Sequence, residues 1–439
     1  MPISNSAGSS ATSLSSVPSD NPFRNINFRW LFGGAAISMF GDQFTLIALP
    51  WLVLQLTDDP FALASTVAAI MIPRAMLILF GGALVDRHSP KLMLLLAKIV
   101  SALTLTLLSL LEIRGVVDMR CIYTLSILLG MVSALGMPAS AALLPRIIEE
   151  QRLAGANRLL MGLNQAAALI GPMAAGFLIA RYDHRANGEL HPLGLGIALL
   201  IDGVSFFISA WTLSKITISN NTVATGLVVK PLRLLHEVQV AFVYLWADSR
   251  LRACCLYWIA IAFCIGGPMQ VALPILANTR LNADAAALGI LVASHSAGSL
   301  IGMLFANIGF KWRKINLGAK ILLIDALIGA LLVPVGFLSV VWLAAIFLFL
   351  IGACGGYIQI GIYTWVQRKI APELLGRAMS LFMFLIMVFT PISVVLTGCL
   401  LRVFAVSYVF LAIGFLLICI ALAAHMLTDI AKINDMEPS

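Results

Sequence analysis

The chain has 439 residues, of which 61% are hydrophobic and only 11% are charged. A soluble protein carries about twice that charged fraction, so the composition excludes an ordinary soluble enzyme or binding module. The formal charge of +8 would suit a protein that binds nucleic acid, so the position of each base along the chain decides what that charge means.

Twelve apolar stretches are long enough to cross a membrane. The hydrocarbon core is about 30 Å thick, so a spanning helix needs about 20 apolar residues. The stretches are residues 30–55, 61–85, 91–112, 119–144, 158–180, 193–213, 252–277, 286–309, 316–339, 341–366, 376–401 and 405–427. The predicted fold is an all-α integral membrane protein with 12 transmembrane helices.

Lys and Arg residues gather in alternate loops. When the amino terminus and the even-numbered loops are placed on the cytoplasmic side, 21 of the 28 basic residues fall on that side, Lys98 and Lys320 among them. Six fall on the opposite side, and Arg74 lies within a span. The positive-inside rule then predicts that both termini are cytoplasmic. The basic charge therefore reflects membrane topology, and no nucleic-acid partner is expected.

The predicted spans form two pseudo-symmetric six-helix bundles joined by one long connector. Residues 1–22 are rich in serine and are expected to form a disordered cytoplasmic tail. The amino-terminal bundle covers 23–213 and the carboxy-terminal bundle 252–428, followed by a cytoplasmic tail at 429–439. The connector, 214–251, is a cytoplasmic loop in which apolar residues recur at helical spacing, which predicts a helix lying on the membrane surface.

Spans 5 and 11 repeat one pattern. Arg158 is followed fourteen residues later by Pro172, and Arg377 is followed fourteen residues later by Pro391. Parallel repeats of this kind are typical of transporters whose two halves rock about a site near the bilayer midplane.

The loop between spans 2 and 3 reads GGALVDRHSPKL and resembles the loop signature of the major facilitator superfamily. A Ser-Pro pair replaces the usual glycine and base. The resemblance implies a conformational latch between the halves, in which an aspartate at a helix N-terminus is stabilised by the helix dipole. The residues assigned to this latch are Gly82, Asp86, Arg87, Lys91 and Arg377. The alternative is that Asp86 only caps the third span.

Four further stretches narrow the resemblance. Residues 37–63, 136–157, 202–210 and 367–381 look like the branch of this superfamily that contains the enterobactin exporter and the macrolide-efflux proteins. The resemblance implies a monomeric secondary active transporter in the bacterial cytoplasmic (inner) membrane. It would export a small amphiphilic molecule, a drug-like compound or a metabolite, by proton antiport with alternating access. Siderophore export is the alternative, with an importer or a lipid transporter of the same fold less favoured.

Residues 168–177 in span 5 resemble a second signature of the superfamily, one associated with exporters. Gly171, Pro172 and Gly176 match it, while two alanines replace glycines. A proline bends the helix and small residues let a neighbouring helix approach. The alternative is an ordinary kinked packing helix. Span 4 lacks the arginine that many proton-driven antiporters of the superfamily carry, so proton coupling here must use other residues.

Asp42 in span 1 is the predicted coupling acid. A charge at mid-bilayer costs about 2.5–3.5 kcal/mol, so a buried ionisable group usually has a function. Burial favours the neutral form of an aspartate, which lets Asp42 bind and release a proton. It shares a helical face with Ser38 and Thr45, and Arg74 in span 2 is its expected counter-charge. The alternative is a permanent structural pair of Asp42 and Arg74.

Three other ionisable residues lie within spans. Asp202, Asp325 and His295 are expected to be capped, paired or hydrogen-bonded locally, since spans 6 and 9 are usually peripheral in this superfamily and a lone histidine is most often structural. Neutral polar residues are predicted to line the transport cavity together with Asp42. These are Asn164, Gln165, Gln270, Gln359 and Tyr363.

No motif in the chain indicates an enzyme. The sequence contains no phosphate-binding P-loop, no zinc-protease helix and no cysteine spacing typical of metal ligands. We therefore expect no cofactor and no metal. The expected partners are a small-molecule substrate, protons and the lipid bilayer.

Overall fold

The computed structural model describes residues 21–182, 185–186, 189–190, 193–217, 242–243, 246–281, 284–308, 316–370 and 374–433. Within these ranges the regular structure is helical apart from one short hairpin. Its strands have two residues each, and β1 (Arg185–Ala186) pairs antiparallel with β2 (Glu189–Leu190).

The first half contains η1 (Pro22–Arg24), α1 (Ile26–Thr57), α2 (Pro60–Arg87), α3 (Pro90–Ile113), α4 (Met119–Ile147), α5 (Glu150–Tyr182) and α6 (Leu193–Ser214). The second half contains α8 (Ser249–Gly267), the π-helical turn η2 (Pro268–Ala272), α9 (Leu273–Thr279), α10 (Ala285–Ile308), α11 (Leu317–Val335), α12 (Val341–Lys369), α13 (Leu375–Val403), α14 (Val406–Leu427) and η3 (Asp429–Lys432). In the described part of the chain, twelve helical segments are long and apolar enough to span a membrane, with α8, η2 and α9 forming one of them. This confirms the predicted fold class.

Polar residues at the helix N-termini explain where several helices begin. The first turn of a helix leaves backbone N–H groups without partners, and an Asn or Asp side chain at the N-cap accepts a hydrogen bond from them. Asn25 caps α1, Asp59 caps α2, Asp118 caps α4 and Asp248 caps α8, with side-chain oxygens 2.8–2.9 Å from backbone nitrogens. Each cap therefore lies at the boundary between an apolar run and a turn.

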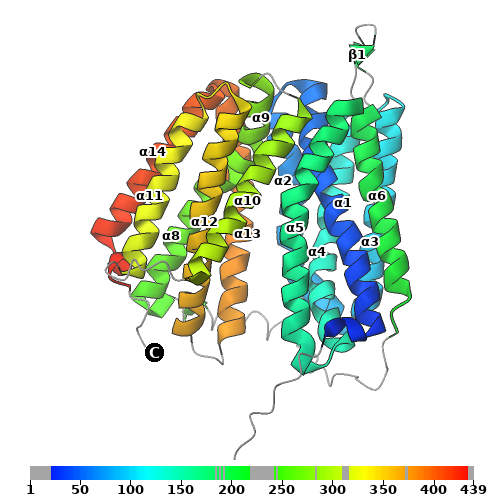
Figure 1. Ribbon diagram of the computed structural model, residues 1–439, viewed down its shortest axis with the longest axis horizontal. Helices are drawn as coiled ribbons and strands as arrows, with labels where there is room; N and C mark the ends of the chain where they lie inside the picture. The colour runs from blue at the N-terminus through cyan, green and yellow to red at the C-terminus, as the bar shows by residue number, and fades with distance from the viewer. Residues whose placement is uncertain are drawn as a thin grey trace, which may run out of the picture.

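The helices form two bundles side by side, α1–α6 in one and α8–α14 in the other (Figure 1). The start of α1 and the end of α14 lie at the same end of the molecule, referred to below as the terminal end. The opposite end contains the turn between α1 and α2 and is referred to as the far end (Figure 1). The six bases that the sequence assigns to the non-cytoplasmic side belong to turns and helix ends at the far end: Arg114, Arg120, Arg181, Arg185, Arg280 and Arg402.

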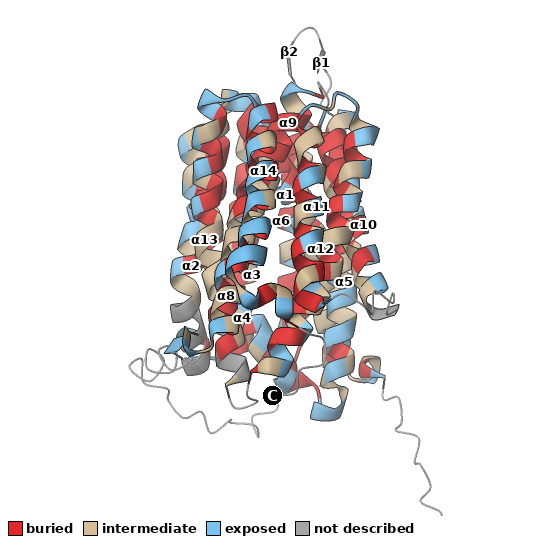
Figure 2. Cartoon of the chain, turned by 90° about the vertical axis from the view of Figure 1, so that its left-hand side faces the viewer, coloured by how far each residue is buried: buried red, intermediate tan, exposed pale blue. Residues whose placement is uncertain are grey.

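Burial follows the helix faces. Buried residues lie on the sides of the helices that face other helices, and exposed ones run along the outer sides (Figure 2). Many exposed side chains are large and apolar, such as Leu103, Phe177 and Trp342. Their exposure is consistent with a surface whose solvent is lipid.

Glycines bring α10 and α12 together. A Cβ on Gly298 would lie 1.9 Å from the carbonyl oxygen of Phe349, and one on Gly352 would lie 2.1 Å from the carbonyl oxygen of His295. Small residues at such contacts allow close backbone packing between membrane helices. His295 thus belongs to a tightly packed helix pair.

The two halves meet along two helix pairs, α5 with α10 and α2 with α13. A Cβ on Gly289 of α10 would lie 2.3 Å from the carbonyl oxygen of Pro172, and one on Gly398 of α13 would lie 2.2 Å from the Cβ of Ala64. These contacts lie toward the far end of the helices, so the backbones of the halves approach each other closely there.

Three predicted segments lie largely or wholly outside the described residues. They are the tail at 1–22, most of the connector at 214–251 with its surface helix, and the tail beyond residue 433. The proposed division into two bundles, a connector and two tails stays a prediction at these segments.

Candidate functional site

A cavity of about 390 Å³ lies within the first half, between α1, α2, α3, α4 and α6. Its volume falls within the range of small-molecule sites. Three charged residues lie on its wall: Asp42 from α1, Arg74 from α2 and Lys98 from α3. The structure therefore brings the two predicted residues Asp42 and Arg74 to one cavity, and adds a lysine. Their role in transport stays a prediction.

Asp42 and Arg74 do not form a close ion pair. Among the described residues no ion pair of 4.0 Å or less joins them, and Asp42 is exposed on the cavity wall. The Nη2 of Arg74 donates to the Sδ of Met137 at 2.7 Å, and its Nε is buried without a hydrogen-bond partner. Lys98 and Arg74 line the same cavity as Asp42, so two positive charges lie near its carboxylate. The acid is thus compensated without being locked in a permanent pair.

The position of Lys98 differs from the sequence prediction, which places this base on the cytoplasmic side. Lys98 is the ninth residue of α3, and its Nζ donates to the Ser38 Oγ at 2.9 Å inside the bundle. The same nitrogen lies 4.5 Å from the centre of the Phe206 ring. The difference arises from the direction of the side chain. Lys98 lies on the face of α3 that carries the buried Leu94 and Ser101, so its side chain points into the bundle. Its spacing from these two residues was the signal in the sequence.

Lys320 is the fourth residue of α11 and is only 7% exposed. It lies near the start of its helix, and its assignment to the cytoplasmic side stays a prediction.

Asp202 of α6 lies behind Asp42 and away from the cavity wall. It is 1% exposed and accepts hydrogen bonds from the hydroxyls of Thr45 and Ser205. Gly41 makes this approach possible, because a Cβ there would lie 2.6 Å from the Asp202 Oδ1. The charges of Asp42 and Lys98 both act on it. Sequence reasoning expected local pairing for Asp202 and did not place it beside Asp42.

These four residues, Asp42, Arg74, Lys98 and Asp202, form a charge cluster in the first half. It contains two acids and two bases, so it is electrically balanced when every member is ionised. Uncompensated charges are expensive in a low-dielectric interior, and a balanced set reduces that cost. The cluster takes one member from each of α1, α2, α3 and α6.

The five neutral residues predicted beside Asp42 do not lie on the wall of this cavity. Gln165 instead bridges the halves, with its Nε2 donating to the Sδ of Met303 at 3.3 Å. Tyr363 packs its ring edge-on against those of Trp258 and Phe382. The other three are distributed over α5, η2 and α12: Asn164, Gln270 and Gln359.

The second half contains a buried acid without a place in this cavity. Asp325 of α11 is 4% exposed and accepts a hydrogen bond of 2.6 Å from the hydroxyl of Tyr257 on α8. This is the local pairing that the sequence led us to expect for it.

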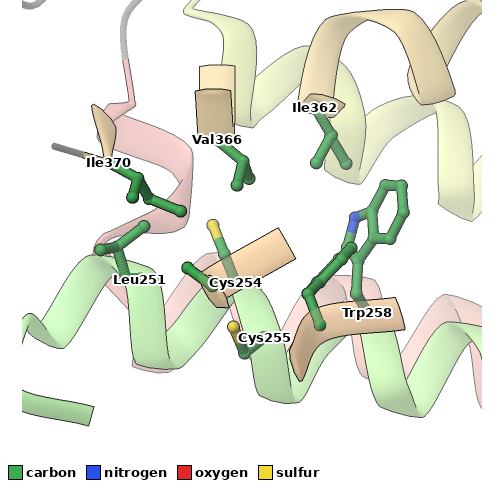
Figure 3. Close-up of a pocket in the computed structure, with 9 residues that line it drawn as sticks. Leu251, Cys254, Cys255, Trp258, Ile362, Val366 and Ile370 are labelled. Atoms are coloured by element: carbon green, nitrogen blue, oxygen red, sulfur yellow. The ribbon is translucent and has the colours of Figure 1, made fainter. Parts of the chain in front are cut away.

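A much smaller cavity of about 10 Å³ lies between α8, α12 and α13. Cys254 and Trp258 of α8 extend toward Val366 and Ile362 of α12, and Cys255 also lines the cavity (Figure 3). A space of this size holds about one water molecule. Its wall is formed by apolar and thiol side chains, so it offers little to orient a polar substrate.

The residues of the predicted latch are described only in part. Lys91 donates from its Nζ to the carbonyl oxygens of Ser214 and Ile216, at 3.0 and 2.6 Å, within the first half. The side chains of the other latch residues lie outside the described part of the structure: Gly82, Asp86, Arg87 and Arg377. The latch stays a prediction.

The exporter-like residues of α5 lie where three helices meet. A Cβ on Gly171 would lie 2.4 Å from the Cγ of Gln43 on α1, and one on Gly176 would lie 2.5 Å from the carbonyl oxygen of Ala285 on α10. The segment that contains Pro172 therefore packs against both its own half and the other one. Its association with export stays a prediction.

An ion pair joins the halves at the far end. The Nε of Arg402 on α13 donates to the Oδ1 of Asp59 at 2.9 Å, its Nη2 donates to the Oδ2, and its guanidinium lies 4.5 Å from the Phe61 ring centre. The hydrogen bond from Arg402 holds the pKa of Asp59 below its usual range. Sequence reasoning counted Arg402 only as a base on the non-cytoplasmic side and missed its partner.

Comparisons with known proteins agree with this architecture. The sequence profile described as Major Facilitator Superfamily matches residues 31–392. Macrolide efflux protein A of Streptococcus pyogenes is 22% identical over 419 residues, covering 93% of this chain and 98% of that protein. An uncharacterized MFS-type transporter of Bacillus subtilis, YvqJ, is 23% identical over 362 residues, covering 81% of each chain.

Solved structures share the fold at low identity. A bacterial homologue of the iron transporter ferroportin in an inward-facing state is 16% identical with a TM-score of 0.68, covering 90% of this chain and 98% of that one. A D-xylose–proton symporter is 12% identical with a TM-score of 0.69, covering 94% of this chain and 99% of that one. The profile match and the twelve apolar helices of the described chain together indicate a multi-pass membrane transporter of small molecules rather than an enzyme. Since the profile spans most of the chain and the fold agrees, the chain belongs to the Major Facilitator Superfamily.

Proposed function

We propose that this protein exports a small amphiphilic molecule across the bacterial cytoplasmic membrane in exchange for protons. The observation that carries the proposal is an acid, Asp42, exposed in a cavity of about 390 Å³ inside a membrane bundle. The same wall carries apolar side chains such as Leu31, Met39 and Phe206 beside several hydroxyls. Such a mixture suits an amphiphile.

Of the similar proteins, the sequence relative favours export, whereas the solved structures do not indicate a direction of transport. The protein named macrolide efflux protein A aligns along nearly its whole length, which favours export. The D-xylose–proton symporter has the same fold, so the fold alone favours neither direction. Export is therefore inferred from the sequence relative, and proton coupling from the charge cluster.

The charge cluster supplies a physical reason for exchange. When all four members are ionised the cluster is neutral, and a molecule with a basic group is attracted to the exposed Asp42. When Asp42 takes up a proton, the cluster gains one net positive charge and repels the same molecule. Proton and substrate then exclude each other, which is the linkage that antiport requires.

We further propose that the terminal end faces the cytoplasm and that the far end is the closed gate of this conformation. The bias of bases toward the terminal end supports this orientation. The Asp59–Arg402 pair and the close contact of Gly289 with Pro172 hold the halves together at the far end. Transport would alternate this arrangement with one in which the far end is open.

The test uses purified protein in liposomes, a radiolabelled macrolide as the probe and an imposed proton gradient. Wild-type protein should accumulate the macrolide against its concentration gradient, and Asp42→Asn should reduce accumulation to the level without a proton gradient. The matched control is Asp429→Asn, which removes an exposed carboxylate of η3 far from the cavity and should transport normally. Accumulation that persists unchanged without the gradient, or in Asp42→Asn, contradicts the proposal.

A further inference from the structure

We infer that an outer groove between α1 and α6 binds one anionic phospholipid from the leaflet at the terminal end of the molecule. The two helices lie side by side in the first bundle (Figure 1). The groove between them has a volume of about 590 Å³ and is referred to below as the outer groove. The inference concerns a resident lipid and depends neither on proton coupling nor on the direction of transport.

The wall of the outer groove is apolar. It is formed chiefly by Ile37, Phe40 and Phe44 of α1 and by Ile201, Val204 and Ile208 of α6. Ile37, Val204 and Ile208 are 40%, 43% and 36% exposed, so this face of the bundle is open to its surroundings. The hydroxyl of Ser205, which also lines the groove, already donates to the Asp202 carbonyl oxygen at 2.7 Å. A surface of this kind at membrane depth suits an acyl chain.

The outer groove is separated from the cavity that contains Asp42. Behind the groove α1 and α6 are in close contact, since a Cβ on Gly41 would lie 2.1 Å from the Ser205 Oγ. Nearer the terminal end, a Cβ on Gly34 would lie 2.1 Å from the Thr212 Oγ1. Asp42 faces the cavity on the other side of α1. A molecule in the groove therefore has no path to this cavity, which favours a resident lipid over a transported substrate.

Two tryptophans and two bases lie at the terminal end of the groove. The rings of Trp30 on α1 and Trp211 on α6 meet edge-on, with 5.6 Å between their centres. The Nζ of Lys215 lies 5.6 Å from the centre of the Trp211 ring. Arg29 is exposed in the first turn of α1. Tryptophan is enriched at the level of the lipid headgroups, and Lys and Arg attract anionic lipids there. The charge at this end is thus complementary to an anionic headgroup.

The bases share helix faces with the groove. Residues three or four positions apart lie on one side of a helix, and such a series runs along α6 from the charged end into the groove. Its members are Lys215, Trp211, Ile208, Val204 and Ile201. On α1, Arg29 and Phe40 are eleven positions apart, which is about three turns and returns to the same face. One molecule can therefore contact the charged end and the groove together.

The length of the groove fits one acyl chain. The distance along α6 from Ile208 to Ile197, the outermost lining residues of that helix, is about 16 Å at 1.5 Å per residue. One leaflet contributes about 15 Å to the hydrocarbon core. Trp211 lies about one turn beyond Ile208 and Lys215 about one turn further, which is the direction of the headgroups. The site therefore has the dimensions of a single phospholipid.

The experiment is native mass spectrometry of the purified full-length protein with added phosphatidylglycerol or phosphatidylcholine of identical acyl chains. Wild-type protein should bind one phosphatidylglycerol at least about fivefold more tightly than phosphatidylcholine. Lys215→Gln and Arg29→Gln should each weaken binding of phosphatidylglycerol about fivefold and leave binding of phosphatidylcholine unchanged. Val204→Trp fills the groove and should abolish the tight site for phosphatidylglycerol.

Two matched controls separate this site from general contact with lipid. Lys432→Gln removes an exposed base of η3 at the same end of the molecule, and Leu103→Trp enlarges an exposed residue on the outer side of α3. Both should bind phosphatidylglycerol like wild type. If Val204→Trp does not fold, Ile37→Trp fills the groove from α1 and gives the same test.

Three results would overturn the inference. Equal affinity for the two lipids, or unchanged binding in Lys215→Gln, Arg29→Gln and the variant that fills the groove, would show that the protein has no selective lipid site here. Displacement of the bound lipid by sn-glycerol 3-phosphate would assign the bases to a free phosphate compound. Displacement by a macrolide would assign the groove to the transported substrate.

Discussion

The adjacent residues Gly41 and Asp42 of α1 have different structural roles. Gly41 lies against α6, where an added Cβ would meet the Ser205 Oγ at 2.1 Å and the Asp202 Oδ1 at 2.6 Å. Asp42 faces the cavity and the bases of α2 and α3. Successive helical positions point about 100° apart, so one turn of α1 both packs the bundle and presents the acid.

Gly41→Ala should therefore disturb the cluster without changing its charge. The new methyl group displaces Ser205 and Asp202, and overpacking of this kind costs about 1–3 kcal/mol of stability. Thermal unfolding of the purified protein should show a lower midpoint than wild type. The matched control is Gly33→Ala in the same helix, where an added Cβ has no neighbour within 4 Å. Equal midpoints for Gly41→Ala and wild type would show that the contact is not tight.

At the residue scale, the sequence predicts how deep a charged residue lies in the membrane better than it predicts which way the side chain points. Asp42 and Arg74 could be singled out because a charge in the middle of an apolar run is rare and expensive. The sequence places Lys98 on the cytoplasmic side, because a base at that distance from the helix end can either extend to the membrane surface or point into the bundle. Asp202 could not be linked to Asp42, because nothing in one sequence tells which face of α6 meets α1.

At the element scale, the thickness of the hydrocarbon core explains why the sequence predicts most of the helices. All twelve predicted spans are present among the described helices, because each requires about 20 apolar residues in a row. The interruption of the seventh span was not predicted. There α8 passes into the π-helical turn Pro268–Ala272 before α9 begins. The backbone N–H of Gly267 donates to the Ser393 Oγ of α13 at 2.9 Å, and the Ser393 hydroxyl donates to the carbonyl oxygen of Phe263.

Ser393 thus supports the irregular backbone from a neighbouring helix. Ser393→Ala leaves both backbone groups without this partner and should destabilise the protein by about 1–3 kcal/mol. Chemical unfolding of the purified protein measures the loss. Ser296→Ala is the matched control, since that hydroxyl bonds only to the Val292 carbonyl of its own helix. If both variants unfold alike, the hydroxyl of Ser393 gives the turn no support.

At the scale of the whole molecule, the two halves are held by contacts of different kinds. Backbone meets backbone at Gly289 and Pro172, while the Asp59–Arg402 ion pair joins α2 to α13 at the far end. The first contact is close packing. The second is electrostatic and depends on both partners keeping their charges.

Loss of the ion pair should shift the population toward a far-end-open state. We expect Arg402→Gln to lengthen the distances between spin labels attached to the far ends of α2 and α13, measured by double electron–electron resonance. The charge reversal Asp59→Arg/Arg402→Asp should restore the wild-type distances, whereas either reversal alone should not. Identical distance distributions in all variants would assign closure of the far end to packing alone.

The same pair should resist moderate acidity. The hydrogen bond from Arg402 lowers the pKa of the Asp59 carboxyl, so Asp59 is ionised throughout the neutral and weakly acidic range. The contribution of the pair is fully present above the ordinary aspartate pKa of about 3.9 and is lost as the pH falls through the lowered value. Spin-label distances should therefore be unchanged between about pH 7 and about pH 5, and should lengthen only below about pH 4.

The position of the Asp59–Arg402 pair also exposes it to dissolved salt. Arg402 is about half exposed, with 52% of its side-chain surface accessible, so mobile ions reach it freely. Their screening length shrinks from about 30 Å at 0.01 M to about 3 Å at 1 M. High salt should thus weaken the contact that closes the far end, while the acids and bases enclosed in the first bundle should be affected little.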